Sequence, residues 1–190
     1  MSPDSSIFVT PPTATSIESF AFANNHTIRE VIIPASVKHI GRSAFRNCNS
    51  LRRVVIEAPI HAIQAECFFY CLHLEEIILP RTVTRIGKEA FAYCPQLTTI
   101  NLPDRLEVIG DKAFLSCERL QLDRLPSHLI SIGDSAFSWC KSLALTEIPP
   151  SVLHIGDHAF ADCDRISHLR ISATTHVGHD IYYRHRVITE

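Results

Sequence analysis

The chain of 190 residues lacks two features that would place it in common functional classes. It has no basic excess, because 18 Lys and Arg face 20 Asp and Glu, for a formal net charge of −2. Proteins that bind DNA or RNA usually carry a clear basic excess, so no nucleic-acid partner is expected. No apolar run approaches the roughly 20 residues that a membrane helix needs, so membrane insertion is not expected either.

Signals for export and for chemistry are also missing. The N-terminal stretch MSPDSSIFVTPP has no basic region and only a three-residue apolar run, which predicts a cytoplasmic protein unless the chain belongs to a longer one. The chain holds no C-x-x-C, no H-E-x-x-H and no glycine-rich phosphate loop. We therefore expect no metal, no other cofactor and no enzymatic activity. With 46% hydrophobic residues, the chain can nevertheless bury a core.

What the sequence does contain is one phrase repeated at a spacing of 23 residues. IGKEAFAYC begins at Ile86, IGDKAFLSC at Ile109, IGDSAFSWC at Ile132 and IGDHAFADC at Ile155. Three further columns follow the same period: Phe22, Phe45, Phe68, Phe91, Phe114, Phe137, Phe160; Cys48, Cys71, Cys94, Cys117, Cys140, Cys163; and Ile28, Leu51, Leu74, Leu97, Leu120, Leu143, Ile166. Such columns without an insertion are typical of a repeat protein.

Each repeat reads as two short extended pieces and one short helical piece. In LEEIILP the apolar residues before Pro80 alternate as in a strand, and Pro80 ends it because proline cannot donate to a ladder. TVTRIG predicts a second extended piece, and Gly87 suits a tight turn there. KEAFAYC predicts one or two helical turns, because helical spacing places Ala90, Phe91 and Cys94 on one face.

One such unit cannot bury its own apolar face, whereas stacked copies bury it continuously. The sequence therefore predicts an α/β repeat solenoid of the leucine-rich-repeat kind, with about seven repeats. Residues 1–15 are predicted to be an N-terminal tail whose IFV segment docks on the first repeat. Residues 16–172 form the predicted solenoid, and residues 173–190 a degenerate C-terminal repeat or cap, offset by one residue.

The repeat resembles the BspA-like leucine-rich repeats, whose pattern is close to L-x-x-I-x-L-P-x-x-V-x-x-I-G-x-x-A-F-x-x-C-x-x-L. The stretch LEEIILPRTVTRIGKEAFAYCPQL matches that pattern position by position. The resemblance covers about four fifths of the chain and is specific for the fold. It implies a binding or adhesion surface, often on bacteria or protists, and no catalytic residues.

Three repeats depart from this pattern. Gln64 stands where the other central repeats have glycine. In LQLDRLP and LALTEIP, Leu122 and Leu145 come one place early, and Asp123 and Thr146 occupy the usual isoleucine column. To keep its apolar side chains inward, the strand must rotate about its axis there, so we expect a local shift of the strand face or a bulge.

Seven cysteines suggest disulfides or zinc at first sight. Six of them share one inward column with parallel side chains, which is poor disulfide geometry and favours buried free thiols. Cys67 and Cys71 lie four residues apart, but a zinc site would need two further ligands. Asn25 begins an N-x-T sequon but stands in the cysteine column, so we interpret it as an inward side chain that satisfies backbone groups.

Histidines gather near the C-terminus and leave a metal-dependent enzyme or a pH-sensitive site as an alternative. They fall in different repeat columns, however, which favours solvated side chains. The histidines concerned are His154, His158, His168, His176, His179 and His185.

Two surfaces are candidates for binding a partner. Two columns beside the cysteines hold apolar and aromatic residues that would form a strip along one side of the solenoid: Phe69, Tyr70, Tyr93, Leu115 and Trp139. The strand face holds basic residues in the early repeats, including Arg52 and Arg53, which could steer an acidic partner. The alternatives are packing between adjacent turns for the strip and a solvated face of mixed charge for the arginines.

We therefore predict a non-catalytic protein–protein interaction module, a leucine-rich-repeat scaffold with a protein partner of unknown identity. The alternative within binding is a cell-surface or secreted adhesin, as the resemblance implies. The open ends of a solenoid also allow self-association.

Overall fold

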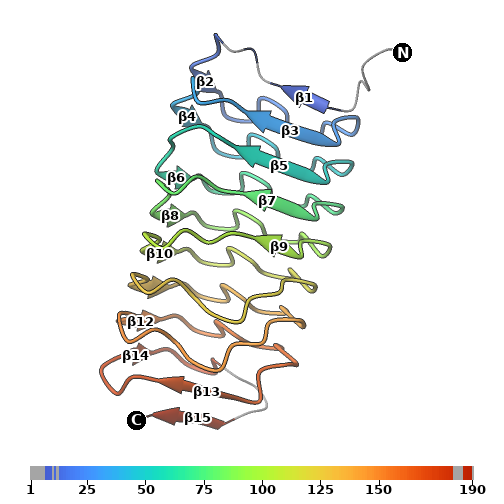
Figure 1. Ribbon diagram of the computed structural model, residues 1–190. Coiled ribbons are helices and arrows are strands. Elements are labelled where there is room, and N and C mark those ends of the chain that lie inside the picture. Colours follow the sequence, from blue (N-terminus) through green and yellow to red (C-terminus); the bar gives the residue numbers. More distant parts are fainter. Residues whose placement is uncertain (1–6, 10, 12, 182–185, 190) are drawn as a thin grey trace.

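The computed structural model describes residues 7–9, 11, 13–181 and 186–189, and it confirms the predicted solenoid. Successive turns of the chain stack on one another into an elongated body, with residues 7–9 at one end and residues 186–189 at the other (Figure 1). Parallel strands pair residues that lie one repeat apart, as Val31 pairs with Val54 and Val54 with Ile77. Each copy of the phrase therefore adds one layer to a shared core.

Two parallel ladders run along the solenoid, one for each extended piece of the repeat. The first piece forms β1 (Ile7–Val9), β3 (Glu30–Ile33), β5 (Arg53–Ile56), β7 (Glu76–Ile78) and β9 (Thr99–Ile100), and then β13 (His168–Ile171) and β15 (Arg186–Thr189). The second piece forms β2 (Ser16–Ile17), β4 (His39–Ile40), β6 (Ala62–Ile63), β8 (Arg85–Ile86), β10 (Val108–Ile109), β11 (Ser131–Ile132), β12 (His154–Ile155) and β14 (His176–Val177).

Both ends of the chain contribute strands to these ladders. The IFV segment forms β1, and Ile7 pairs with Glu30 of β3 one full repeat later. At the other end His176 pairs with His154, 22 residues earlier, so this last layer is offset by one residue. Of the predicted terminal segments, residues 1–6, 10, 12, 182–185 and 190 lie outside the described residues.

The prediction of helical turns is wrong, because the AFxxC segment is a chain of tight turns. In one repeat, the N–H groups of Glu89, Phe91 and Tyr93 donate to carbonyls of the next repeat at 2.7–2.9 Å. In a helix, these N–H groups would instead donate to carbonyls four residues earlier in the same repeat. The third side of each repeat therefore forms a ladder of its own, and Glu89 and Tyr93 take left-handed φ angles of 55° and 60° to make it.

Close packing between repeats, and not a left-handed turn, is what requires the glycine column. None of the described glycines has a positive φ angle. A Cβ atom on Gly110 would lie 2.9 Å from the backbone carbon of Gly87 and the nitrogen of Lys88. Only a residue without a side chain allows two backbones to come this close.

The second ladder breaks where Gln64 replaces glycine. The strands β2 and β4 form one pair, β6 begins a separate six-stranded sheet, and the two sheets are not joined by strand pairing among the described residues. Gln64 follows β6 directly, so it carries a side chain at the position where glycine allows neighbouring repeats to approach closely. The turn ladder continues across this break, with the Ser43 N–H donating to the Ala65 carbonyl at 3.0 Å.

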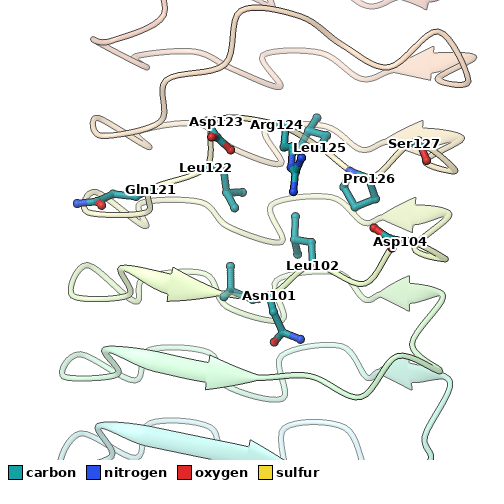
Figure 2. Close-up of a pocket in the computed structure, with 11 residues that line it drawn as sticks. Asn101, Leu102, Asp104, Gln121, Leu122, Asp123, Arg124, Leu125, Pro126 and Ser127 are labelled. Atoms are coloured by element: carbon teal, nitrogen blue, oxygen red, sulfur yellow. The ribbon is translucent and has the colours of Figure 1, made fainter.

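The first ladder breaks between β9 and β13, at the two repeats with shifted leucines (Figure 2). Asp123 and Thr146 are exposed, although they stand in the usual isoleucine column, and Leu145 is buried instead. The expected shift of the strand face is confirmed at Leu145, and regular strand structure is lost at both repeats.

The core is built from stacked columns of identical residues. The phenylalanine rings from Phe22 to Phe160 stack with centroids 5.1–5.5 Å apart and planes within 9° of parallel. Beside them the cysteine thiols are buried. Within the described ranges, the structure holds no helix that could cross a membrane.

Candidate functional site

The predicted aromatic strip lies on the turn segments, beside the cysteine column. Phe69, Tyr70 and Tyr93 form one cluster, with all three pairs of ring centroids 5.6–5.9 Å apart. Tyr70 and Tyr93 keep 42% and 39% of their surface exposed, whereas Phe69 is half-buried. The sequence-predicted residues of the strip are thus partly brought together in this cluster.

Trp139 and Leu115 belong to the same two columns but lie further along the solenoid. Trp139 is 47% exposed and has Ser116 between itself and Tyr93 in the column. The Lys141 ammonium lies over the indole, 5.4 Å from the ring centroid. Leu115 is half-buried, and its carbonyl accepts the Tyr93 N–H at 2.7 Å.

The exposed aromatic residues stand at backbone positions that suit other residue types. Tyr70, Tyr93 and Trp139 have φ angles of 61°, 60° and 63°. The same column holds Asn24, Asn47 and Asp162 in the outer repeats, also at left-handed φ. Asparagine and aspartate tolerate this conformation, whereas a bulky side chain there costs about 1–3 kcal/mol. The middle repeats therefore carry exposed rings where asparagine would strain the backbone less.

Cations flank both ends of the strip. The Arg46 guanidinium lies over the Phe69 ring, 4.2 Å from its centroid, and is also paired with Glu66. Lys141 lies over Trp139 and pairs with Glu118 at 3.0 Å. Each cation thus has an acidic partner within the chain and holds its neighbouring ring in place.

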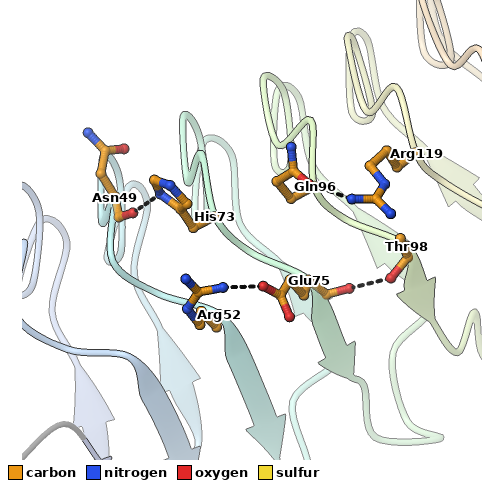
Figure 3. A network of polar contacts seen from close by, with 7 residues as sticks. All are labelled: Asn49, Arg52, His73, Glu75, Gln96, Thr98 and Arg119. Carbon is orange, nitrogen blue, oxygen red and sulfur yellow. Dashed lines mark hydrogen bonds and ion pairs between the residues drawn. The ribbon is translucent and has the colours of Figure 1, made fainter.

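The arginines predicted on the strand face are tied to acidic residues of neighbouring repeats. Arg53 donates to Glu30 at 2.5 Å and to Glu76 at 2.7 Å, which links β3, β5 and β7. Arg52 pairs with Glu75, as Figure 3 shows. Their charges are compensated within the sheet. This agrees with the alternative given above, a solvated face of mixed charge, and leaves little net positive charge to attract an acidic partner.

Figure 3 also shows how the turns beside this sheet are joined. The His73 ring nitrogen Nδ1 lies 2.5 Å from the Asn49 carbonyl, and Arg119 donates to the Gln96 side chain at 2.8 Å. Thr98 donates its hydroxyl to the Glu75 carbonyl at 3.1 Å. These contacts connect one repeat to the next, so they serve the stacking of layers.

The cysteine column is inert in this geometry. Each of the six thiols of the column donates to a phenylalanine carbonyl 26 residues earlier at 3.1–3.2 Å. Burial raises the pKa of Cys48 and of Cys163 to about 12, and raises the pKa of Cys67, Cys71, Cys117 and Cys140 as well. A thiol that keeps its proton is a poor nucleophile and a poor metal ligand.

The other polar residues that the sequence singled out are Asn25 and the C-terminal histidines. The Asn25 side-chain oxygen accepts hydrogen bonds from the backbone N–H groups of Thr27 and Ile28 at 2.9 Å. This agrees with its interpretation as a side chain that satisfies backbone groups. Of the C-terminal histidines, His154, His168, His176 and His179 are exposed, and His185 lies outside the described residues. Among the described residues, no group of three or more His, Cys, Asp or Glu side chains could hold a metal ion.

A groove that sequence reasoning missed lies at the break in the first ladder. A cavity of about 530 Å³ opens there between the repeats of β9 and Leu122 (Figure 2). The shift in the leucine pattern was the signal for it, since a strand that loses its register leaves space beside its neighbour.

Comparison with known proteins is consistent with the solenoid. The model of the BspA type leucine rich repeat region matches residues 4–121 and 108–189 in six copies. A leucine-rich repeat protein of Bacteroides ovatus has 27% identity and a TM-score of 0.71 over 93% of this chain. A leucine-rich repeat protein of T. pallidum has 26% identity and a TM-score of 0.76 over 86% of this chain.

The chain spans 60% of the B. ovatus protein and 79% of the T. pallidum protein. A third structure, from Eubacterium ventriosum, shares the fold at 20% identity and a TM-score of 0.65, over 70% of this chain and 42% of that one. No curated protein matches the sequence. The family model covers nearly all of the residues, and the stacked phenylalanine, cysteine and glycine columns supply its core. The chain belongs to the family of BspA-type leucine-rich repeat proteins.

Proposed function

We propose that this chain is a non-catalytic interaction module whose aromatic strip binds a protein partner. The strip consists of Phe69, Tyr70, Tyr93, Leu115 and Trp139. A repeat scaffold with no metal-binding cluster among its described residues supports a binding role. Tyrosine and tryptophan are enriched among the residues that dominate protein interfaces.

One observation carries this proposal: exposed rings stand at left-handed backbone positions. Tyr70, Tyr93 and Trp139 strain the backbone and keep 39–47% of their surface exposed. Neither feature favours folding, because asparagine at the same position costs less strain and exposes less apolar surface. The left-handed φ itself belongs to the turn ladder, since Glu89 takes it too, so it is the presence of exposed rings at such positions that supports a binding role.

The chemistry of the strip defines the kind of partner. Its rings offer apolar faces, and their neighbouring cations Arg46 and Lys141 are already paired with Glu66 and Glu118. A partner surface that presents apolar side chains would gain most from contact, since the charges at both ends are satisfied. Salt should therefore have little effect on the affinity.

The cytoplasm is the compartment we propose for this interaction. Seven buried thiols without a disulfide suit a reducing environment. The alternative is an adhesin displayed on the cell surface, and surface labelling of intact source cells followed by detection of this chain separates the two. Labelling of the chain in intact cells would contradict the cytoplasmic proposal.

The direct test is affinity capture from the source lysate with two forms of the chain. The variant carries Tyr70→Asn, Tyr93→Asn and Trp139→Asn, which removes the rings and keeps a residue suited to left-handed φ. A protein that the native chain captures, that the variant loses, and that then binds the native chain as a purified component would support the proposal. Arg29→Ser serves as the control, because Arg29 is exposed on the strand face.

Equal capture by the native chain and the triple variant would contradict the strip as the binding surface. Capture of further copies of this chain alone would instead favour self-association through the solenoid ends, where β1 is an edge strand.

A further inference from the structure

A second surface, independent of the aromatic strip, lies where the first ladder is interrupted. We propose that this groove binds an extended acidic peptide segment with one apolar side chain at its centre. The groove is a chain of adjoining cavities between β9 and β13, and its position follows from the two repeats that depart from the family pattern.

Three cavities make up the groove and share lining residues. The central one, of about 530 Å³, lies between Leu102 and Leu122. A cavity of about 420 Å³ adjoins it at Asn101, Leu102 and Asp104. A third, of about 370 Å³, adjoins it at Leu122 and Asp123 and reaches Arg165. Because neighbouring turns lie about 5 Å apart, a groove across four turns spans about 15 Å, the length of about five extended residues.

The floor of the groove is apolar. Leu102 and Leu122 are half-buried, and Figure 2 shows them on successive turns with their side chains directed into the space between those turns. Ile100 and Leu125 lie beneath, each 6% exposed. A floor of four aliphatic residues suits one apolar side chain of a ligand and disfavours a charged one.

Strand pairing is lost along the groove. Between β7 and β9 the ladder is regular. Beyond β9 no strand among the described residues pairs with it on the other side, and the turns beside the groove are joined by single hydrogen bonds such as that from the Gln121 N–H to the Thr98 carbonyl.

Charge determines which peptide the groove would accept. Four exposed arginines line the three cavities: Arg81, Arg105, Arg124 and Arg165. None of them forms an ion pair within the described part of the chain. The acidic residues that share these cavities are Asp104 and Asp123. The arginines of the strand face, such as Arg53, are by contrast paired.

An excess of unpaired guanidinium groups around an apolar floor is complementary to carboxylates on either side of an apolar residue. Figure 2 shows the Arg124 side chain directed toward Leu102, so it lies across the central cavity. We therefore expect Arg124 to contact a ligand carboxylate next to the apolar anchor.

Fluorescence anisotropy with a labelled Asp-Glu-Leu-Glu-Asp peptide tests this proposal on the full chain. We expect saturable binding to the native protein, weakened about tenfold or more by Arg124→Glu and by Leu122→Gln. Arg29→Glu makes the same charge change on the strand face of an early repeat and should leave the affinity within about twofold. Circular dichroism of each variant checks the fold.

Two further probes separate charge from the apolar anchor. A peptide with lysine in place of its acidic residues, and one with serine in place of leucine, should each bind at least about tenfold more weakly. No binding of the acidic peptide, or an equal loss in Arg29→Glu and Arg124→Glu, would overturn the proposal. Sedimentation that shows dimers lost in Arg124→Glu would overturn it in favour of a second copy as the occupant.

Failure of this site is distinguishable from failure of the aromatic strip. The triple variant of Tyr70, Tyr93 and Trp139 should bind the acidic peptide like the native chain, because none of these residues lines the groove.

Discussion

The thiol of Cys117 donates a hydrogen bond to the backbone carbonyl of Phe91, 26 residues earlier, at 3.1 Å. The same bond recurs from Cys140 to Phe114 and from Cys94 to Phe68. Each cysteine thus joins its own repeat to the one before it, beside the stacked phenylalanine rings. Two neighbouring columns, one donating and one stacking, hold the solenoid layers in register.

Removing one ring from the phenylalanine stack should destabilise the chain strongly. Phe114 is fully buried, and its ring stacks on those of Phe91 and Phe137. Phe114→Ala leaves a cavity between two layers and should lower the free energy of unfolding by about 3–5 kcal/mol. Urea denaturation followed by circular dichroism measures this change.

The matched control is Phe22→Ala, at the end of the stack, where the ring is half-buried. Its cost should be clearly smaller, since less apolar surface is lost. Equal costs at Phe22 and Phe114 would contradict the importance of the central stack.

Adding a single methyl group to a residue of the glycine column should destabilise the fold. Gly110→Ala places a Cβ atom 2.9 Å from the backbone of the preceding repeat, so the two repeats must separate locally. We expect a loss of about 2 kcal/mol or more and faster amide hydrogen exchange in β8 and β10. Gln64→Ala is the control, because the ladder is already open beside Gln64. A loss in Gln64→Ala as large as that in Gly110→Ala would contradict this account of the break.

Alkaline pH should destabilise the folded chain through its buried thiols. Burial raises the pKa of Cys163 from 9.0 to about 12, so the folded protein keeps a proton that the unfolded chain releases. The stabilisation is complete below about pH 9 and is lost as the pH rises toward 12, by about 1.4 kcal/mol per pH unit for each such thiol. Urea denaturation in reducing buffer, at about pH 8 and about pH 10, measures the slope.

Cys163→Ser removes one titrating thiol and keeps a hydrogen-bond donor at the same place. Its slope above about pH 9 should be smaller than that of the native chain. An unchanged slope would mean that other groups cause the alkaline loss.

The fold could be predicted from the sequence because its core is periodic. The columns of Phe91, Cys94 and Leu97 repeat without insertion, and stacking is the one arrangement that buries them all. The turn segments could not be predicted correctly, because the spacing of Ala90, Phe91 and Cys94 fits one face of a helix as well as the inside of a tight-turn ladder. The two differ in where the backbone N–H groups donate, and that depends on the neighbouring repeat.

The candidate sites show the same limit. The residues of the strip could be found from their columns, but the left-handed backbone beneath Tyr93 and Trp139 depends on the turn ladder and has no sequence signal within a single repeat. The groove was visible only as misplaced leucines at Leu122 and Leu145. Its arginines lie on different turns and line three adjoining cavities, so their proximity could be found only from the stacking geometry.

Strain beneath the strip leads to a prediction about stability. Trp139→Asn removes a bulky residue from a φ angle of 63° together with its exposed cation–π interaction with Lys141. Asparagine tolerates a left-handed φ better than other non-glycine residues do, which offsets part of the burial and of the cation–π energy of about 0.5–1 kcal/mol that disappear with the ring. Trp139→Ala removes the ring without this gain. Trp139→Asn should therefore be more stable than Trp139→Ala.

The most direct test of the binding role compares partner affinity with stability in one variant. The chain with Tyr70→Asn, Tyr93→Asn and Trp139→Asn is titrated with the purified captured partner, and its unfolding free energy is measured beside that of the native chain. Our account predicts an affinity at least about tenfold weaker in a variant that is still folded. Unchanged affinity in that folded variant would contradict the account.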